Sequence, residues 1–553
     1  MLKRRNLVSL ALALWLLLGL STNALAGDVS LAGDDALYEA MLSSAAYMAE
    51  TVKHPQLGSV GGEWAVLGIA RSGYEMSERY YQEYYAGVED YVKACEGVLH
   101  KKKYTEYSRL TVALTAIGKD PTDVGGYNLL TPLGDFDKTI WQGLNGPIWA
   151  LIALDSGNYD MPVNPEAKTQ ATRQKYIDEI LKNQLEDGGF SLTGMGGADP
   201  DMTGMALQAL AKYQDQEKVK QVTDEALRCL SAMQNETGGY GSWGTVNSES
   251  VVQVITALCE LGIPLDDERF VKNGHTLLEN LLSFRHADGS FTHILDGTDG
   301  NNQMSSEQGL YGLVAAYRAE QGLPSLYRMT DALSVGEGER AQRGAGLSGK
   351  HTDVKAVPIT APGTTFDDAF SSEYVAAIEA LAARGIINGV GENAFAPEDS
   401  MTRAQFAAIV VRALGLTAGQ GGAAGKPFSD VAAGSWYHDY VLAAAGYGIV
   451  TGVGEGKFNP EGTITRQEAA VMVARAAKLC GMETDLGTAE TRDMLAQFGD
   501  YLQSADWARP SLAFCYREGI LDDSVLDIQP KEAITRGEIA QMLFSLLTTA
   551  NLL

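Results

Sequence analysis

The residues of the N-terminal half whose types could support chemistry are carboxylates. They form two close pairs and two single positions: Asp135 and Asp137, Asp199 and Asp201, Glu249, and Glu307. Two carboxyl groups about 5–10 Å apart suit general acid–base cleavage of a glycan. Aromatic rings could stack on its sugars, and the candidates are Trp64, Trp141, Trp149, Trp243 and Tyr311. The same acids could instead cap helices, because a helix start favours negative charge. The sequence leaves capping, ligand contact and catalysis open.

A repeat of about 50 residues predicts the elements that would position these side chains. The segments 183–190, 233–240 and 284–291 resemble one another and end in an aromatic residue. In the first two, a Gly-Gly pair permits the left-handed backbone that ends a helix and reverses the chain. Extending the count predicts six helical hairpins, near 35–73, 79–117, 123–155, 168–213, 217–261 and 268–321. Six hairpins close an α6/α6 toroid with an inner and an outer ring, so we expect a mainly α protein.

The run from Gln184 to Phe190, which reads Q-x-x-D-G-G-F, resembles a squalene cyclase repeat of the terpene cyclase and protein prenyltransferase toroid superfamily. The runs 141–147 and 247–250 look more like exported bacterial relatives of that superfamily. Those relatives also resemble the helical domain of the cobalamin carriers. The resemblance covers residues 27–328 and implies the α/α toroid fold rather than an activity.

The motifs for the chemistry of those enzymes are incomplete. Cationic terpene cyclases use a DxDD motif, whereas Met202 follows Asp199-Pro200-Asp201, so one supporting carboxylate is missing. Prenyltransferases hold zinc with Asp, Cys and His, and no suitably spaced Cys accompanies His275, His286 and His293. We therefore assign no catalytic residue and no metal, and we interpret the toroid as a binding or structural module with an unknown ligand. The alternative is a glycan-active hydrolase or lyase, or a terpenoid-like enzyme.

No cofactor is predicted. Cobalamin carriers hold their ligand between the toroid and a small β domain, and this chain shows no such domain, so a corrinoid is only weakly supported.

Composition and the N-terminal segment predict an exported protein. Residues 1–26 resemble a signal peptide, with Lys3, Arg4 and Arg5 before the apolar stretch 7–20 and a small-x-small site at 24–26. We expect no stable membrane span once it is cleaved. The net charge is −27, from 43 basic and 70 acidic residues, which disfavours nucleic acid as a partner. The five cysteines are too scattered for a disulfide framework.

A second repeat occupies residues 365–420, 427–482 and 496–550, after a Gly-, Ser-, Thr- and Pro-rich stretch, 329–364, that we interpret as a flexible linker. Each unit contains a Thr-Arg pair that should start a helix: Thr402-Arg403, Thr465-Arg466 and Thr535-Arg536. A Gln or Glu stands three residues after each Thr, which completes the pattern of a capping box.

These units resemble three tandem S-layer homology modules, a family of α-helical repeats. Members bind secondary cell-wall polysaccharide, often through a pyruvylated sugar, in grooves between three pseudo-symmetric prongs. Carried over by motif, the binding residues are Asp368, Tyr374, Arg403, Asp430, Trp436, Arg466, Asp500, Trp507 and Arg536. Arginine at a helix start suits a carboxylate. The alternative to a binding role is that these Asp and Arg residues only cap and brace helices and that the tryptophans lie in the core.

The three grooves are not expected to be equal. The first repeat has Tyr374 in place of Trp, and the third has Asp522-Asp523 where the second has Thr451-Gly452. We expect the groove that uses the second repeat to be the best formed. The resemblance implies a secreted protein held non-covalently on the cell wall, at the S-layer surface of a bacterium.

Overall fold

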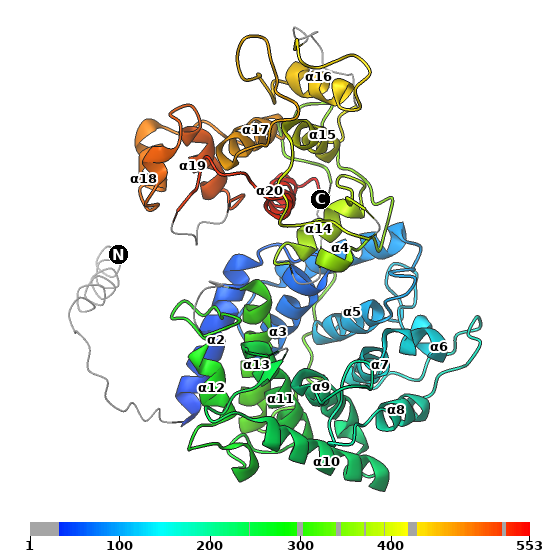
Figure 1. Cartoon of the computed structure of the whole chain (residues 1–553). Helices are drawn as coiled ribbons and strands as arrows, with labels where there is room; N and C mark the ends of the chain where they lie inside the picture. The colour runs from blue at the N-terminus through cyan, green and yellow to red at the C-terminus, as the bar shows by residue number, and fades with distance from the viewer. Residues whose placement is uncertain are drawn as a thin grey trace, which may run out of the picture.

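The structure is a computed structural model, and it describes residues 33–242, 244–295, 302–338, 344–369, 372–391, 393–417, 428–521 and 527–553. The predicted signal peptide, Trp243 and the pair Asp522-Asp523 lie outside the described residues. Two helical bodies follow one another along the chain (Figure 1). The protein is mainly α, as predicted, and the sheet that the structure describes is a small hairpin of β1 (Gly241–Ser242) and β2 (Thr245–Val246).

Six helices form a closed inner ring in the first body. They are α3 (Trp64–Ser72), α5 (Thr105–Ala116), α7 (Asn145–Ser156), α9 (Pro200–Leu210), α11 (Ser248–Leu261) and α13 (Gln303–Glu320). Each packs against the next in this order, and α13 packs against α3, so the ring closes. These helices are apolar on most sides and largely buried, as expected for helices surrounded by others.

An outer helix precedes each inner one. The outer helices are α2 (Gly33–Thr51), α4 (Glu78–Ala94), α6 (Phe136–Thr139), α8 (Arg173–Lys182), α10 (Glu217–Met233) and α12 (Leu277–Ser283). The six pairs correspond to the six predicted hairpins, so the α6/α6 toroid is confirmed, although the outer helix of the third pair is a single turn. Because every inner helix follows an outer one, all six inner helices start at the same end of the ring. We call this end the mouth.

The repeated turn between hairpins depends on its glutamine and its two glycines. The amide Nε2 of Gln184 donates to the carbonyl of Gly188 at 2.8 Å, and that of Gln234 does the same to Gly238. Gly188 has φ 88°, a left-handed angle that glycine adopts without strain. A side chain at Gly189 would place its Cβ 2.4 Å from the Cβ of Ala198. Both glycines of the motif are therefore required by the turn.

The second body is a smaller ring of three repeats. Its long helices are α15 (Arg403–Ala413), α17 (Arg466–Leu479) and α20 (Arg536–Thr549), which pack on one another. The shorter helices are α14 (Val375–Ala382), α16 (His438–Gly446), α18 (Thr488–Leu495) and α19 (Arg509–Arg517). Helix α16 packs on α15, α19 on α17, and α14 on α20, so the last repeat closes on the first. The capping boxes predicted from Thr402, Thr465 and Thr535 are all present.

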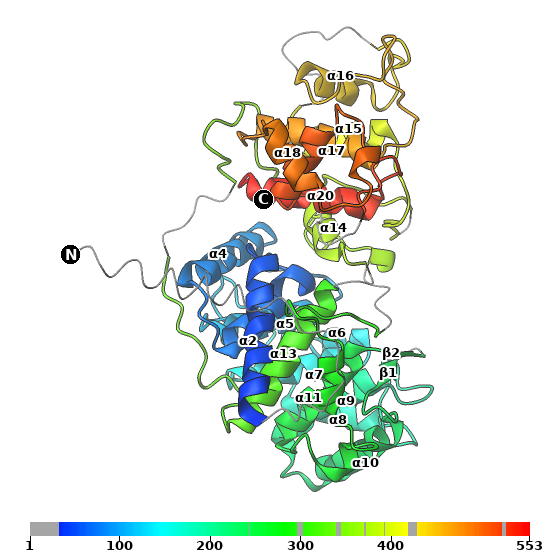
Figure 2. The ribbon, with the colours of Figure 1, turned by 90° about the vertical axis from the view of Figure 1, so that its left-hand side faces the viewer.

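The segment between the bodies is hydrogen-bonded to both where the structure describes it. The amide of Leu333 donates to the carbonyl of Ala116 in the toroid at 3.1 Å, and His351 donates to Leu479 in the second body at 2.7 Å. Helix α14 is the helix of the second body that lies nearest the toroid (Figure 2), where it contacts the turn η1 (Ser59–Glu63). The flexible linker stays a prediction. Among the described residues, no helix has both the length and the apolar character needed to span a bilayer.

Candidate functional site

Three arginines join the repeats of the second body into a ring. Each stands at the start of a long helix and donates to a backbone carbonyl of the next repeat. Arg403 Nε donates to Phe458 at 3.0 Å, Arg466 Nη1 to Ile528 at 2.9 Å, and Arg536 Nε to Phe395 at 2.8 Å. The last of these links the third repeat to the first across 141 residues of sequence. The arginines therefore have a bracing role, which the sequence left as one of two readings.

The three aspartates hold the same loops by accepting hydrogen bonds from backbone N–H groups of those loops. Both carboxylate oxygens of Asp430 accept backbone N–H groups, from Phe458 and Asn459, each at 2.8 Å. Asp368 and Asp500 make the equivalent pairs of bonds. Burial acts to raise the pKa of Asp430, but the two backbone donors outweigh it and hold that pKa below its usual value. Asn459 has φ 60°, so each aspartate clamps a loop residue in the left-handed region.

The aromatic positions of the second and third repeats are on the surface. Trp436 is 58% exposed and Trp507 is 59% exposed, which is unusual for so large an apolar ring. Tyr374, the counterpart in the first repeat, is half-buried and lies over Gly537, where a Cβ would come within 2.3 Å of its ring. The two tryptophans are therefore not core residues, whereas the tyrosine is partly used in packing.

A groove of about 450 Å³ joins side chains from all three repeats. Arg403 comes from the first, Glu468 and Arg475 from the second, and Trp507 from the third. The loop 451–453 forms one wall. We call it the second groove, because its helix, α17, belongs to the second repeat. The three-fold correspondence of the repeats gives the matching positions of the other two. The first groove has Arg536, Gln405, Arg412 and Trp436, and the third has Arg466, Glu538, Ser545 and Tyr374.

The grooves differ in charge. In the second, Arg403 Nη1 pairs with Glu468 at 2.7 Å, and in the third Arg466 pairs with Glu538. The first has Gln405 at that position, and Arg536 makes no ion pair with any residue that the structure describes; its Nη2 donates to the carbonyl of Asn388 at 3.0 Å. Burial lowers the pKa of Arg536, and only the more distant Asp399 and Asp368 oppose that shift.

At these four matched positions the first groove has two arginines and no carboxylate, the second two arginines and one carboxylate, and the third one of each. Sequence reasoning missed Gln405 and the second arginine, although Arg412 and Arg475 both stand nine residues after the motif arginine, where the third repeat has Ser545.

The mouth of the toroid holds most of the other predicted residues. Asp199 caps α9 by accepting the N–H of Met202 at 2.9 Å, and Asn247 and Asn302 cap α11 and α13 in the same way. Asp135 caps the short outer helix α6, while Asp137 is exposed on its first turn. Capping is therefore the structural role of Asp199 and Asp135.

Glu249 and Asp201 occupy the same position of successive repeats, two residues after the cap. Glu249 reaches the next helix, where Ser305 Oγ donates to it, and His293 Nδ1 lies 2.7 Å from its other oxygen. Asp201 is one methylene shorter. Its Oδ1 and the hydroxyl of Ser250, the counterpart of Ser305, are both buried without a hydrogen-bond partner in the described structure. Burial raises the pKa of Asp201 to about 6. The nearby hydroxyl of Ser250 opposes this shift, and the carboxylates Asp199 and Glu249 add to it.

Glu307 is fully buried between α13 and the start of α3. Its Oε1 accepts from the backbone of Gly61 at 2.7 Å and from Gln303 at 2.8 Å, while Oε2 has no partner among the described residues. Burial raises the pKa of this carboxyl to about 8, so it is largely protonated at neutral pH.

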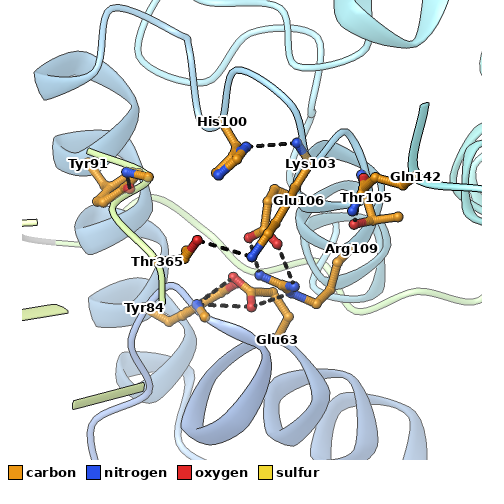
Figure 3. A network of polar contacts seen from close by, with 12 residues as sticks. Glu63, Tyr84, Tyr91, His100, Lys103, Thr105, Glu106, Arg109, Gln142 and Thr365 are labelled. Atoms are coloured by element: carbon orange, nitrogen blue, oxygen red, sulfur yellow. Dashed lines mark hydrogen bonds and ion pairs between the residues drawn. The ribbon is translucent and has the colours of Figure 1, made fainter. Parts of the chain in front are cut away.

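An ion cluster lines the side of the mouth that faces the second body (Figure 3). Arg109 Nε donates to Glu63 at 3.0 Å, and its Nη2 donates to Glu106 at 2.6 Å. Next to it, Lys103 Nζ donates to Thr365 Oγ1 at 3.1 Å, at the start of the second body. Burial raises the pKa of Glu379 on α14 to about 7, with Glu106 adding to the shift. Sequence reasoning missed this cluster, because Glu63 comes from another hairpin than Arg109 and Glu379 comes from the second body.

Aromatic rings occupy the interior of the ring below the mouth. The centroids of Trp64 and Trp149 are 5.1 Å apart, and those of Trp64 and Tyr311 are 6.0 Å apart. Both tryptophans are half-buried. Trp141 instead stands on the surface, 61% exposed, with Lys102 5.0 Å above its ring. Nowhere in the described residues do three metal-ligating side chains come together.

A family model for the S-layer homology domain matches residues 365–407, 427–470 and 497–540. The chain carries three S-layer homology domains. It is similar to the exoglucanase XynX of Acetivibrio thermocellus, with 30% identity over 37% of this chain and 18% of that protein. It is also similar to the S-layer protein sap of Bacillus anthracis, with 28% identity over 34% of this chain and 22% of that one. The chain thus spans less than a quarter of either relative.

Two solved structures are similar over about half of this chain. The unsaturated glucuronyl hydrolase of Bacillus sp. GL1 shares 13% identity, with a TM-score of 0.37 over 53% of this chain and 99% of that one. The protein geranylgeranyltransferase-I of Candida albicans shares 14% identity, with a TM-score of 0.36 over 51% of this chain and 92% of that one. A likeness at this level carries no argument about activity.

Proposed function

We propose that the three S-layer homology domains anchor this protein non-covalently to an acidic secondary cell-wall polysaccharide on a bacterial surface, where the toroid is displayed as a ligand-binding module. The observation that supports it best is the composition of the grooves, in which arginines lie beside exposed tryptophans. An indole face packs on the apolar side of a sugar ring, and a guanidinium binds a carboxylate through two hydrogen bonds.

The charge difference between the grooves favours the first one for an acidic sugar such as a pyruvylated one. In the second and third grooves, the motif arginine already forms an ion pair with a glutamate of the protein. An incoming carboxylate would have to compete with that glutamate and would be repelled by it. In the first groove Gln405 is neutral, and neither Arg536 nor Arg412 forms an ion pair with a carboxylate among the described residues. Trp436, at the matching aromatic position, is exposed.

The repeats supply matched substitutions for the test. Gln405→Glu places the second groove's carboxylate in the first groove and keeps the capping box, because Glu468 and Glu538 complete that box in their own repeats. We expect it to weaken binding of the mature protein to purified wall sacculi by about tenfold, the usual effect of losing one charge-assisted hydrogen bond. Glu468→Gln makes the reverse change in the second groove and should strengthen binding.

Trp436→Ala provides a second test of wall binding, since this exposed ring can be removed without opening the core. It should release the protein from sacculi, and Tyr374→Ala should matter less. Replacing the three arginines by alanine would be a poor test of binding, because each also braces a loop of the next repeat. Full retention of both Gln405→Glu and Trp436→Ala would show that the first groove is not the anchor.

A further inference from the structure

The toroid and the second body meet at a polar contact beside the mouth, which we call the docking patch. Lys103 Nζ of the toroid donates to Thr365 Oγ1 at 3.1 Å. The backbone N–H of Gly363 donates to the hydroxyl of Tyr91, also at 3.1 Å. Helix α14 packs against the turn η1, which carries Glu63. Figure 3 shows Thr365 next to the ion cluster of the toroid, so charged groups lie directly at the contact.

The apolar cores of the two bodies do not merge at this patch. The buried apolar residues that the structure describes form two separate cores, one in each body. A domain interface that is small and polar allows the domains to separate, because little apolar surface is exposed to water when it opens. The hydrogen-bonded and charged groups of the docking patch therefore decide whether the bodies stay together.

Glu379 is the acidic residue that the second body brings to the patch on α14. It is half-buried and forms no hydrogen bond and no ion pair with any residue that the structure describes. The second and third repeats have Leu442 and Ala513 at its position, six residues before the glycine of the Gly-Ile turn. Among the three repeats, the acidic residue thus belongs to the one whose helix packs against η1.

The ion cluster of the toroid acts on Glu379 with both signs of charge. Glu106 and Glu63 repel a negative charge there, whereas Arg109 and Lys103 attract it. The guanidinium of Arg109 is already bound to Glu63 and Glu106, so it compensates a third carboxylate poorly. Burial is the largest effect and repulsion by Glu106 is the next, and together they raise the pKa of Glu379 from its ordinary value of 4.5 to about 7.

The other titratable groups that face the patch are His100, Tyr84, Tyr91 and Asp367. Burial raises the pKa of both tyrosines, so their hydroxyls stay neutral up to alkaline pH. Burial lowers the pKa of His100, so protonation of this ring at acid pH would oppose docking. That response is opposite in sign to the response of Glu379. Docking that strengthens from pH 8 to pH 6 therefore identifies the carboxyl.

We propose that the toroid docks on the first S-layer homology domain through this patch and that ionisation of Glu379 releases it. When the carboxyl is protonated, it adds no repulsion, and the hydrogen bonds of Lys103 and Gly363 hold the bodies together. When it is ionised, its charge is desolvated and repelled by Glu106, and separation returns it to water. The mouth is then covered on one side at acid pH and free at alkaline pH. This inference goes beyond the proposed function and does not depend on the ligand of either body.

The direction of the pH dependence follows from proton uptake. The pKa of Glu379 is higher in the docked state than its ordinary value, so docking binds a proton and is strongest at low pH. Docking weakens as pH rises through about 7. Between pH 6 and pH 8, the equilibrium constant for docking should fall about tenfold.

Small-angle X-ray scattering of the full mature chain measures the separation of the bodies. The radius of gyration should be larger at pH 8 than at pH 6. Glu379→Gln keeps the size of the side chain and removes its ionisation, so this variant should be compact at both pH values. Asp224→Asn removes one charge from the exposed face of the outer helix α10 and should keep the wild-type response. Lys103→Ala removes the donor to Thr365 and should separate the bodies already at pH 6.

Three results would overturn the proposal. They are an equal radius of the wild type at both pH values, a pH response that persists in Glu379→Gln, and a Lys103→Ala variant as compact as the wild type at pH 6. Circular dichroism identifies a variant that fails to fold. Should Glu379→Gln fail, Glu379→Leu takes its place, because leucine is the residue that the second repeat has at this position.

Discussion

The two bodies of this protein are both closed rings of repeats, and both place charged side chains at the starts of their central helices. In the toroid the charges are carboxylates, which a helix start favours, and in the S-layer homology domains they are arginines, which it disfavours. Each arginine is compensated by the neighbouring repeat, through a backbone carbonyl and, in two of three cases, a glutamate.

In both rings, the pairing fails where one repeat has a different residue. Gln405 stands where the other repeats have glutamate, which leaves Arg536 without an ion pair among the described residues. Asp201 stands where the next repeat has the longer Glu249, and Asp201 Oδ1 and Ser250 Oγ have no hydrogen-bond partner of normal geometry among the described residues. A side chain that the neighbouring repeat satisfies is structural, and one that it leaves unsatisfied is available to a ligand. The candidate sites are therefore the irregular positions of each ring.

The largest expected effect separates bracing from binding in the second body. Arg403→Ala removes an ion pair with Glu468 and leaves the Phe458 carbonyl without its donor, so it should destabilise that body by about 3–5 kcal/mol. Urea denaturation followed by circular dichroism measures it. An unchanged midpoint would mean that the arginine ring does not hold the repeats together.

The next effect concerns the ionisation of Asp201. Its folded pKa, about 6, is above the unfolded value of 3.8, so the ionised carboxyl destabilises the folded protein. Stability from this group is present at low pH and is lost as pH rises from about 4 to about 6. Asp201→Asn should therefore stabilise the toroid at pH 7 by about 2–3 kcal/mol, with almost no difference at pH 4. A stability difference that is the same at both pH values would contradict the raised pKa.

A smaller effect compares two equivalent serines. Ser305→Ala removes the hydroxyl that donates to Glu249 and should cost about 1–2 kcal/mol, whereas Ser250→Ala removes an unpartnered hydroxyl and should cost much less. Thermal unfolding of the two variants gives the comparison directly. Equal losses of stability in the two variants would show that Ser250 is hydrogen-bonded to Asp201 in solution. The repeat that contains Asp201 would then be paired in the same way as the next one.

The smallest expected effect is on stability at the exposed tryptophans. Trp436→Ala and Trp507→Ala should change the free energy of unfolding by less than about 0.5 kcal/mol, because both rings lie mostly in solvent. Urea midpoints measured beside that of Arg403→Ala provide the check. A loss of stability comparable to that of Arg403→Ala would mean that these rings hold the repeats together as the arginines do. The contrast between structural arginines and ligand-binding tryptophans would then be lost.

Local spacing was enough to predict much of the fold. The 50-residue repeat predicts the hairpins because a Gly-Gly turn must recur wherever a helix pair ends, and Gly188 and Gly238 do adopt left-handed angles. The Thr-x-x-Gln/Glu pattern predicts three capping boxes because all the atoms involved lie within four residues. The arginines of those helices were predicted as ligand contacts, and the structure adds the bracing role that sequence could only offer as an alternative.

The site residues that sequence reasoning missed have partners far along the chain. Arg109 meets Glu63 from another hairpin, and His293 meets Glu249 from another repeat. Nothing in the spacing of these residues indicates the contact. The differences among the grooves were visible as Gln405 and Ser545, but their meaning depends on which arginine faces each position.

The sequence by itself determined the two kinds of repeat, the number of hairpins, the helix caps and the identity of the charged side chain at each helix start. These depend on backbone angles and on hydrogen bonds between near neighbours. Only the tertiary structure decided which charges are satisfied, because closing each ring brings the last repeat against the first, as Arg536 against Phe395 shows. A one-methylene difference at Asp201 then matters, since hydrogen bonding requires contact within about 3 Å and packing sets the gap.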